Sequence, residues 1–370
     1  MMEIRKIYKK DIPNLLNNAA LWNHSFLAIS RHRLEAHYKN PTADDNDVVL
    51  LLAYSEEELV GYMGVFMDKI VLDGVENKIG WLSTWWVHPK TKGSGIGREI
   101  LNTMYDAQDG KIGISQFTPS AKRVYDKSGY FTTLKENPGI KAVLRSNLAF
   151  LIPELYPKLK AFKFVFRILD GLINIFVEAK QYFQKNHLNK KLKPVTIEYL
   201  NTIDAETQQL IEKYGANPIS KKSPAFFEWI KTYHWVQEAP LLNLTQKEKY
   251  EFSMVDQSFN IYLVKVLKDN QPIGFLVLQK RNKMMKVLFA YYDTKEHAAE
   301  ISDVIKLHCI NLNITDLICY DAAICGNLKK SGVFLYTKKR TKQSIISKAF
   351  GKENFDDVTV NFGDGDCSFA

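Results

Sequence analysis

The stretch WLSTWWVHPKTKGSGIGREIL, residues 81–101, joins an apolar run, a proline, a glycine-rich loop and the start of an amphipathic segment. The apolar run ends at Val87, Pro89 closes it, and helical spacing of apolar residues begins at Ile96. This order predicts a strand, a loop and a helix. The glycines of the loop 93–97 let backbone N–H groups approach an oxyanion, and a helix N-terminus carries about half a positive charge. The stretch therefore predicts a diphosphate-binding site.

The patterns around this stretch restrict the fold. Strand and helix signals alternate over residues 1–140, and a hairpin of two apolar strands precedes the loop strand. No Gly-Lys-Ser/Thr sequence closes the loop, which excludes a P-loop, and the preceding hairpin argues against a dinucleotide-binding fold. We therefore expect an α/β protein of the α+β type, with a mixed sheet.

The net charge of +9 is concentrated in one segment. Residues 1–140 carry 17 basic and 17 acidic side chains, and residues 195–370 carry 22 and 21, so both are close to neutral. Residues 141–194 carry 11 basic and 3 acidic side chains, which is nearly the whole excess. A generally basic nucleic-acid domain is therefore excluded, and we expect no nucleic-acid partner.

The length of the chain and its cysteines restrict the class of protein. A chain of 370 residues is expected to form two domains. Its N-terminus has no apolar signal core, and no segment has the roughly 18 uncharged apolar residues that span a bilayer. The four cysteines form no CxxC pair. We therefore expect a cytoplasmic protein with reduced thiols and no metal.

We expect a domain at residues 1–140, a basic helical connector at 141–194 and a second domain at 195–370. The second half repeats the order of strands and helices of the first half, so we interpret it as a diverged duplicate. The segment 153–187 reads as one long helix that is apolar over most of its circumference. Burial of that helix between the domains is our preferred interpretation; the alternative is an interfacial helix attracted to anionic lipid.

Two motifs resemble the GCN5-related N-acetyltransferase (GNAT) family. Residues 87–97, VHPKTKGSGIG, are similar to the family motif Arg/Gln-x-x-Gly-x-Gly/Ala after a strand that ends Val-x-Pro, with Lys92 in place of Arg or Gln. Residues 121–130, AKRVYDKSGY, are similar to the family motif Ala-x-x-Leu-Tyr-x-Lys-x-Gly-Phe, and Thr118 stands where the family often has Asn. The resemblance covers about residues 1–135.

The resemblance implies an acyl-CoA N-acyltransferase fold, in tandem and joined by the helical connector. Its cofactor is acetyl-CoA or another acyl-CoA, used as co-substrate. By this resemblance, the pantetheine arm pairs with the strand Trp85–Val87, and a backbone N–H of that strand holds the oxyanion. The loop holds the pyrophosphate. The implied cofactor-binding residues are Trp85, Trp86, Val87, Lys92, Gly93, Ser94, Gly95, Ile96, Gly97 and Arg98. In the second half, Thr294–Ala298 stands at the loop position without a glycine, so that domain is expected to be degenerate and to bind no coenzyme A.

The resemblance implies that Tyr125 is the general acid that protonates the coenzyme A sulfur; the alternative is a tyrosine that only packs. The general base is not readable, because the strand 79–87 contains no carboxylate. His88 is a candidate base because the unperturbed pKa of histidine is about 6.5, although a histidine before proline is more often a bend residue. Further candidates are His32, Glu35 and Asp68, and a chain of water molecules is an equal alternative, so the base stays open.

The tryptophans of residues 81–86 and the acidic C-terminal tail each have a structural and a functional interpretation. Trp81, Trp85 and Trp86 suit core packing better than the stacking of an acceptor. The C-terminal Gly363–Asp366, GDGD, suits an acidic surface turn better than a cation site.

The expected function is direct N-acyl transfer from acyl-CoA to a small amine acceptor, for which an amino sugar is one candidate. The alternatives are an acyl-CoA-binding sensor or scaffold without turnover, and an O-acyltransferase.

Overall fold

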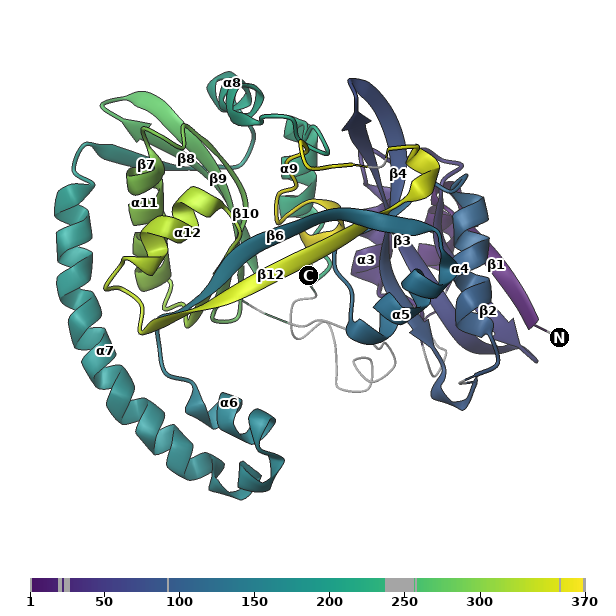
Figure 1. The fold of residues 1–370 in the computed structure, drawn as a ribbon, viewed down its shortest axis with the longest axis horizontal. Coiled ribbons are helices and arrows are strands. Elements are labelled where there is room, and N and C mark those ends of the chain that lie inside the picture. Colours follow the sequence, from purple (N-terminus) through teal and green to yellow (C-terminus); the bar gives the residue numbers. More distant parts are fainter. Residues whose placement is uncertain are drawn as a thin grey trace. The chain divides into compact units, whose positions relative to one another are not determined.

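The computed structural model describes residues 2–18, 22, 27–91, 93–236, 256, 258–352 and 354–368. The chain forms two compact units that interleave in sequence: unit 1 contains residues 1–137, 216–259 and 342–370, and unit 2 contains 138–215 and 260–341 (Figure 1). This division differs from the three contiguous segments expected from the sequence. The reason is that two strands, β6 (Phe131–Val143) and β12 (Tyr336–Ser347), each carry the chain from one unit into the other.

Unit 1 is built on the strand order β1-β2-β3-β4-β5-β12. Only the β4–β5 pair is parallel among the named pairs of this unit, so the sheet is mixed, as expected. The strands and helices are β1 (Met2–Tyr8), α1 (Ile12–Asn17), α3 (Arg31–Tyr38), β2 (Val48–Ser55), β3 (Glu58–Leu72), β4 (Val75–Val87), α4 (Ile96–Ala107), β5 (Ile112–Ile114), α5 (Pro119–Ser128) and α9 (Pro224–Thr232). The strand, loop and helix predicted for residues 81–101 are therefore present in β4 and α4.

Local sequence explains where the helices around the predicted site begin. The hydroxyl of Ser30 accepts the backbone N–H of Arg33 at the start of α3. The hydroxyl of Thr118 accepts the backbone N–H of Ala121 at the start of α5, so this threonine caps the helix. Gly129 ends α5 with φ of 74°, a conformation that favours glycine.

Unit 2 repeats the arrangement of unit 1 with the order β7-β8-β9-β10-β11-β6. Its elements are α6 (Leu148–Leu155), α7 (Lys163–Lys191), β7 (Val195–Leu200), α8 (Ala205–Tyr214), β8 (Asn260–Lys268), β9 (Gln271–Arg281), β10 (Met284–Tyr292), α11 (Ala298–Asn311), β11 (Asp316–Cys319) and α12 (Ala322–Lys329). In each half the chain runs through four strands, a helix, a strand, a helix and a last strand. That last strand pairs in the other unit: β6 with β11, and β12 with β5.

The connector differs from the single buried helix that the sequence predicts. The helical segment breaks after Leu155 into α6, a 3-10 turn at Pro157–Phe162 and α7. Large apolar side chains along α7 are exposed, whereas its polar Asp170, Asn174 and Gln181 face inward and form hydrogen bonds. The side of α7 that carries these three polar residues is therefore the packed side, and the mostly apolar circumference of the segment did not predict it. No helix in the described part of the chain combines the length and apolarity needed to cross a bilayer.

Candidate functional site

The glycine loop adopts the backbone conformation expected of an anion site. Gly93 and Gly95 have φ of 90° and 88°, and Gly95 is the N-cap of α4 without a capping side chain. A Cβ on Gly97 would lie 3.2 Å from the indole of Trp85, so glycine lets α4 pack against β4. The first N–H groups of a helix have no partner within it, so those of α4 face the loop and are available to an oxyanion. Lys92 lies outside the described residues.

Strand β4 loses its pairing with β5 where a pantetheine arm would be expected, while it stays paired with β3 up to Val87. It pairs with β5 only at Gly80 and Trp81, opposite Ile112 and Gly113. Beyond Trp81 the two strands separate. The register against β3 also shifts, because Met63 faces Trp85 but Val65 faces Leu82. This bulge turns the last residues of β4 and leaves their β5-side edge unpaired with β5.

The three tryptophans of β4 lie on two faces. Trp85 packs on the α4 side, 5.4 Å from the ring of Tyr125. Trp86 points to the other side and stacks on Tyr62 at 5.5 Å. Trp81 is fully buried, which fits the core interpretation. Val87 is opposite Gly61 of β3 at the end of the strand.

Tyr125 is buried on α5 and packs in an aromatic cluster with Trp85, Phe117 and Phe131. Burial raises the pKa of its phenol far above the usual value, and the charge of Asp366 raises it further. A phenol with a raised pKa stays protonated at neutral pH and can donate a proton. Among the described residues, none forms a hydrogen bond with the Tyr125 hydroxyl.

The C-terminal GDGD segment is not the exposed acidic turn that the sequence favoured. Gly365, with φ of 71°, lies so close to the end of β5 that a Cβ there would be 2.5 Å from Cβ of Ser115. The Ser115 hydroxyl donates a hydrogen bond to the carboxylate of Asp366. Burial raises the pKa of Asp366, while the hydrogen bond and the charge of Arg33 act in the opposite direction. The tail thus brings a carboxylate to the point where β4 and β5 separate.

Asp364 of the same tail belongs to a buried ion network. Lys222 Nζ lies 2.7 Å from Asp68 Oδ2 and 3.7 Å from Asp364 Oδ1, and all three side chains are almost fully buried. Ser220 and Trp81 also donate to Asp68, at 3.2 and 3.3 Å. Asp68, one of the predicted candidate bases, is therefore occupied by structural partners. The network fixes the tail in unit 1, so the cation that the GDGD segment meets there is a lysine.

The other candidate bases differ in their surroundings. The backbone N–H of Lys90 donates to His88 Nδ1 at 3.0 Å, and the ring lies 5.5 Å from Trp86 at its edge. Glu35 is exposed and His32 is partly exposed on α3.

The same helix α3 carries two buried groups that the sequence did not single out. Arg33 places its guanidinium carbon 3.5 Å from the ring centre of Trp235. His37 is buried 5.2 Å from that ring, between centres. Burial, with the charge of Arg33, lowers the pKa of His37 to about 3.

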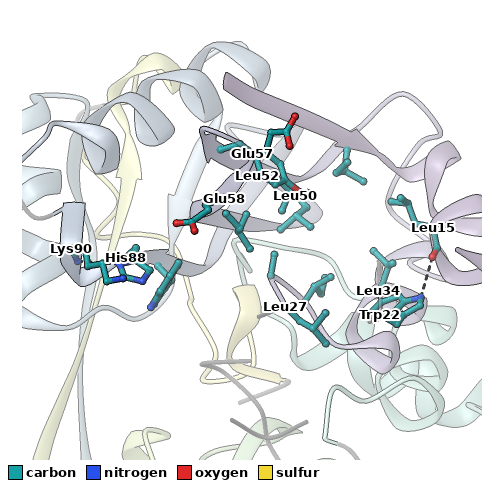
Figure 2. A pocket seen from close by; sticks show the side chains of 16 residues that line it. Leu15, Trp22, Leu27, Leu34, Leu50, Leu52, Glu57, Glu58, His88 and Lys90 are labelled. Atoms are coloured by element: carbon teal, nitrogen blue, oxygen red, sulfur yellow. Dashed lines mark hydrogen bonds between the residues drawn. The ribbon is translucent and has the colours of Figure 1, made fainter. Parts of the chain in front are cut away.

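A pocket of about 510 Å³ lies on the Trp86 side of β4, and its lining combines apolar side chains with charged groups at one end. Figure 2 shows His88 and Lys90 on one side, with Glu57 on the turn between β2 and β3 and Glu58 at the start of β3. Its apolar wall includes leucines of α1, α3, β2 and β3 and the indole of Trp22: Leu15, Leu34, Leu50, Leu52 and Leu59.

The corresponding turn of unit 2 is closed by its own side chains. Asp293 Oδ1 accepts the backbone N–H groups of Lys295 and Glu296, at 2.9 and 3.1 Å. Glu300, in the first turn of α11, forms an ion pair with Lys268 at 2.7 Å. Acidic groups thus occupy the position that glycines occupy in unit 1.

Comparison with known proteins gives the following matches. Residues 3–132 match the family model of the acetyltransferase (GNAT) domain. The aminoglycoside N(6')-acetyltransferase type 1 of Stenotrophomonas maltophilia is 35% identical over 60 residues, which is 16% of this chain and 39% of that protein. The chain thus spans about two fifths of this relative.

Comparison with solved structures gives two further matches. The N-myristoyltransferase of Saccharomyces cerevisiae with bound myristoyl-CoA superposes with a TM-score of 0.50 and 12% identity, covering 93% of this chain and 78% of that one. A GCN5-related N-acetyltransferase from Kribbella flavida gives a TM-score of 0.44 and 10% identity, covering 94% and 70%.

Proposed function

Residues 3–132 of this chain form a domain of the acetyltransferase (GNAT) family, and we propose that the protein transfers an acyl group directly from acyl-CoA to the amine of a small acceptor. The observation that carries the proposal is the end of the β4–β5 pairing at Trp81. The glycine loop follows β4, Tyr125 packs on Trp85 of β4, and Asp366 is hydrogen-bonded to Ser115 directly after β5. The N–H groups of the loop suit a diphosphate, the phenol of Tyr125 suits a leaving thiolate, and the carboxylate of Asp366 suits the proton of an amine.

Acyl-CoA would lie along the free edge of β4. Its pantetheine amides would pair with the backbone of Trp85–Val87, and its diphosphate would receive the N–H groups of Gly93–Arg98 at the start of α4. Acetyl-CoA is the donor we propose. Lys92 and the exposed Arg98 would add positive charge to the diphosphate.

The reaction needs one proton donor and one proton acceptor. The amine nitrogen attacks the thioester carbonyl, the C–N bond forms, and the C–S bond breaks with its electron pair left on sulfur. Tyr125, whose pKa is raised by burial, would donate its proton to that sulfur. A backbone N–H of the Trp85–Val87 strand would stabilise the oxyanion.

Asp366 is the proton acceptor we propose for the amine. It supplies the carboxylate that residues 79–87 of β4 lack, and its raised pKa makes it a stronger base than an exposed aspartate. His88 is the competing candidate. Because its Nδ1 accepts the Lys90 N–H, the neutral ring carries its proton on Nε2 and has no free lone pair toward the pocket.

The pocket beside Trp86 would receive the acceptor. The carboxylates of Glu57 and Glu58 at its edge favour a cationic amine, and its leucine-rich wall favours an apolar body behind that amine. An amino sugar, the acceptor class suggested by the relative's name, would use the acidic edge but not that wall. Both acceptor classes therefore belong in the test.

The test is release of free thiol from acetyl-CoA by the full chain across amino sugars and apolar primary amines. We expect release that depends on an amine and is greatest with apolar amines. Tight coenzyme A binding without release for any amine would instead support the sensor or scaffold function. Release that requires a hydroxyl acceptor would support O-acyl transfer.

A further inference from the structure

Helix α7 presents an exposed apolar face that is built into unit 2. Given about 3.6 residues per turn, Phe164, Ile168, Leu172, Ile175 and Phe176 lie on one side of the helix. They are 49–76% exposed. We call these five residues the apolar face of α7. Monomeric proteins rarely expose a continuous apolar surface of this kind without a partner.

The opposite side of α7 is held firmly by polar contacts. Asp170 accepts the backbone N–H groups of Leu148 and Ala149, at 2.7 and 2.9 Å, and so caps α6. Gln181 accepts from Arg145 at 2.5 Å, and Leu188 is buried in the core of unit 2. Rotating the helix to bury the apolar face would break these contacts. The exposure is therefore set by the packing.

Positive charge gathers at the N-terminal end of α7 and on the 3-10 turn before it. Lys158, Lys160, Lys163 and Arg167 are all exposed, and no acidic residue occurs between positions 155 and 169. An apolar helix face bordered by lysine and arginine is the arrangement by which a helix lies in the interface of an anionic bilayer.

From this combination we propose that unit 2 docks on an anionic lipid surface through the apolar face of α7 and its four flanking cations. The helix would lie in the plane of the interface, with its phenylalanines among the acyl chains. This proposal does not depend on the proposed acyl transfer.

A second copy of the chain is the main alternative occupant. In a symmetric contact the partner offers the same surface, whose positions 155–169 carry four exposed cations and no acidic residue. Anionic headgroups instead carry the opposite charge. Charge therefore favours lipid over a second copy.

The test is flotation of the full chain with vesicles of phosphatidylcholine alone and of phosphatidylcholine mixed with phosphatidylserine. We expect flotation with the mixed vesicles, weakened by added salt. The double variant Phe164→Ser, Phe176→Ser and the triple variant Lys158→Glu, Lys160→Glu, Lys163→Glu should each reduce the partition coefficient at least about tenfold. Because these side chains are exposed, the thermal midpoint of unfolding should not change.

The matched control reverses three exposed cations of β12 in a single variant, Lys338→Glu, Lys339→Glu, Arg340→Glu, and should float like the unmodified chain. Equal loss in this control would show that only net charge matters and would overturn the proposal. So would the absence of flotation with mixed vesicles. A dimer that the double phenylalanine variant converts to a monomer, without vesicle binding, would identify a second copy as the occupant.

Discussion

The Ser115 hydroxyl donates a hydrogen bond to the carboxylate of Asp366, which lies 251 residues further along the chain. Ser115 directly follows β5, so this contact places the C-terminal tail where β5 separates from β4. Residues 79–87 of β4 contain no carboxylate, and the C-terminal tail thereby brings one to them. The contact underlies our assignment of the proton acceptor.

Tyr125→Phe removes the proposed proton donor and keeps the aromatic packing against Trp85. We expect kcat to fall by about a hundredfold or more, with little change in the affinity for coenzyme A, because the ring itself stays in place. Steady-state kinetics with calorimetric binding measures both quantities. A kcat within a fewfold of the unmodified enzyme would show that Tyr125 only packs.

Asp366→Asn and His88→Gln separate the two candidate bases. We expect the asparagine variant to lose most of its kcat, since the amide cannot accept the proton, and the glutamine variant to keep most of it. In the unmodified enzyme, kcat should fall as pH drops through the raised pKa of Asp366, because the carboxyl must be ionised to act. The opposite ranking of the two variants in a pH–rate profile would assign the role to His88.

Gly95→Ala tests the anion loop against a matched position. Gly95 and Gly74 have φ of 88° and 79°, and a Cβ on either would meet no other atom within 4 Å. Each alanine should therefore cost about 1 kcal/mol of folding stability through backbone strain. Only the Gly95 variant should bind coenzyme A more weakly, as measured by calorimetry. Equal affinities in both variants would contradict a diphosphate site at this loop.

Lys222→Met leaves the carboxylates of Asp68 and Asp364 buried without their cation. We expect a loss of about 3–5 kcal/mol in the free energy of unfolding. The control, Lys78→Met, breaks an ion pair with Asp47 whose lysine is one-third exposed, and it should cost no more than about 1 kcal/mol. Urea denaturation measures the free energy of unfolding of both variants. Similar losses would show that the buried network contributes little.

Because His37 is buried in its neutral form, we expect the folded protein to lose stability at acidic pH. Its pKa is lowered from 6.5 in the unfolded chain to about 3 in the folded one, so the unfolded state binds the proton more readily. The stability due to neutral His37 is thus present above pH 6.5 and is lost as pH falls toward about 3, with a slope up to about 1.4 kcal/mol per pH unit. The charge of Arg33 beside it acts in the same direction. Urea denaturation at several pH values should show a shallower slope for His37→Phe; an unchanged slope would contradict the assignment.

The sequence predicts the local parts of the site well. The end of β4, the glycine loop and the beginning of α4 at Ile96 follow from apolar spacing, proline and glycine, all within about 20 residues. Contacts between distant segments are not predictable in this way. The pairing of Asp366 with Ser115 depends on where the tail returns, and the inward position of Asp170 depends on the free N–H groups of α6. Periodicity alone therefore led to the wrong face for α7.

The most direct test of the central claim follows the acyl group itself. Acetyl-CoA labelled in its acetyl group is incubated with the full chain and an amine acceptor, and the labelled amide and the free thiol are both quantified. We predict equal amounts of the two, both lost in Tyr125→Phe. Thiol without labelled amide, a labelled ester in its place, or neither product despite bound coenzyme A would contradict direct transfer to an amine.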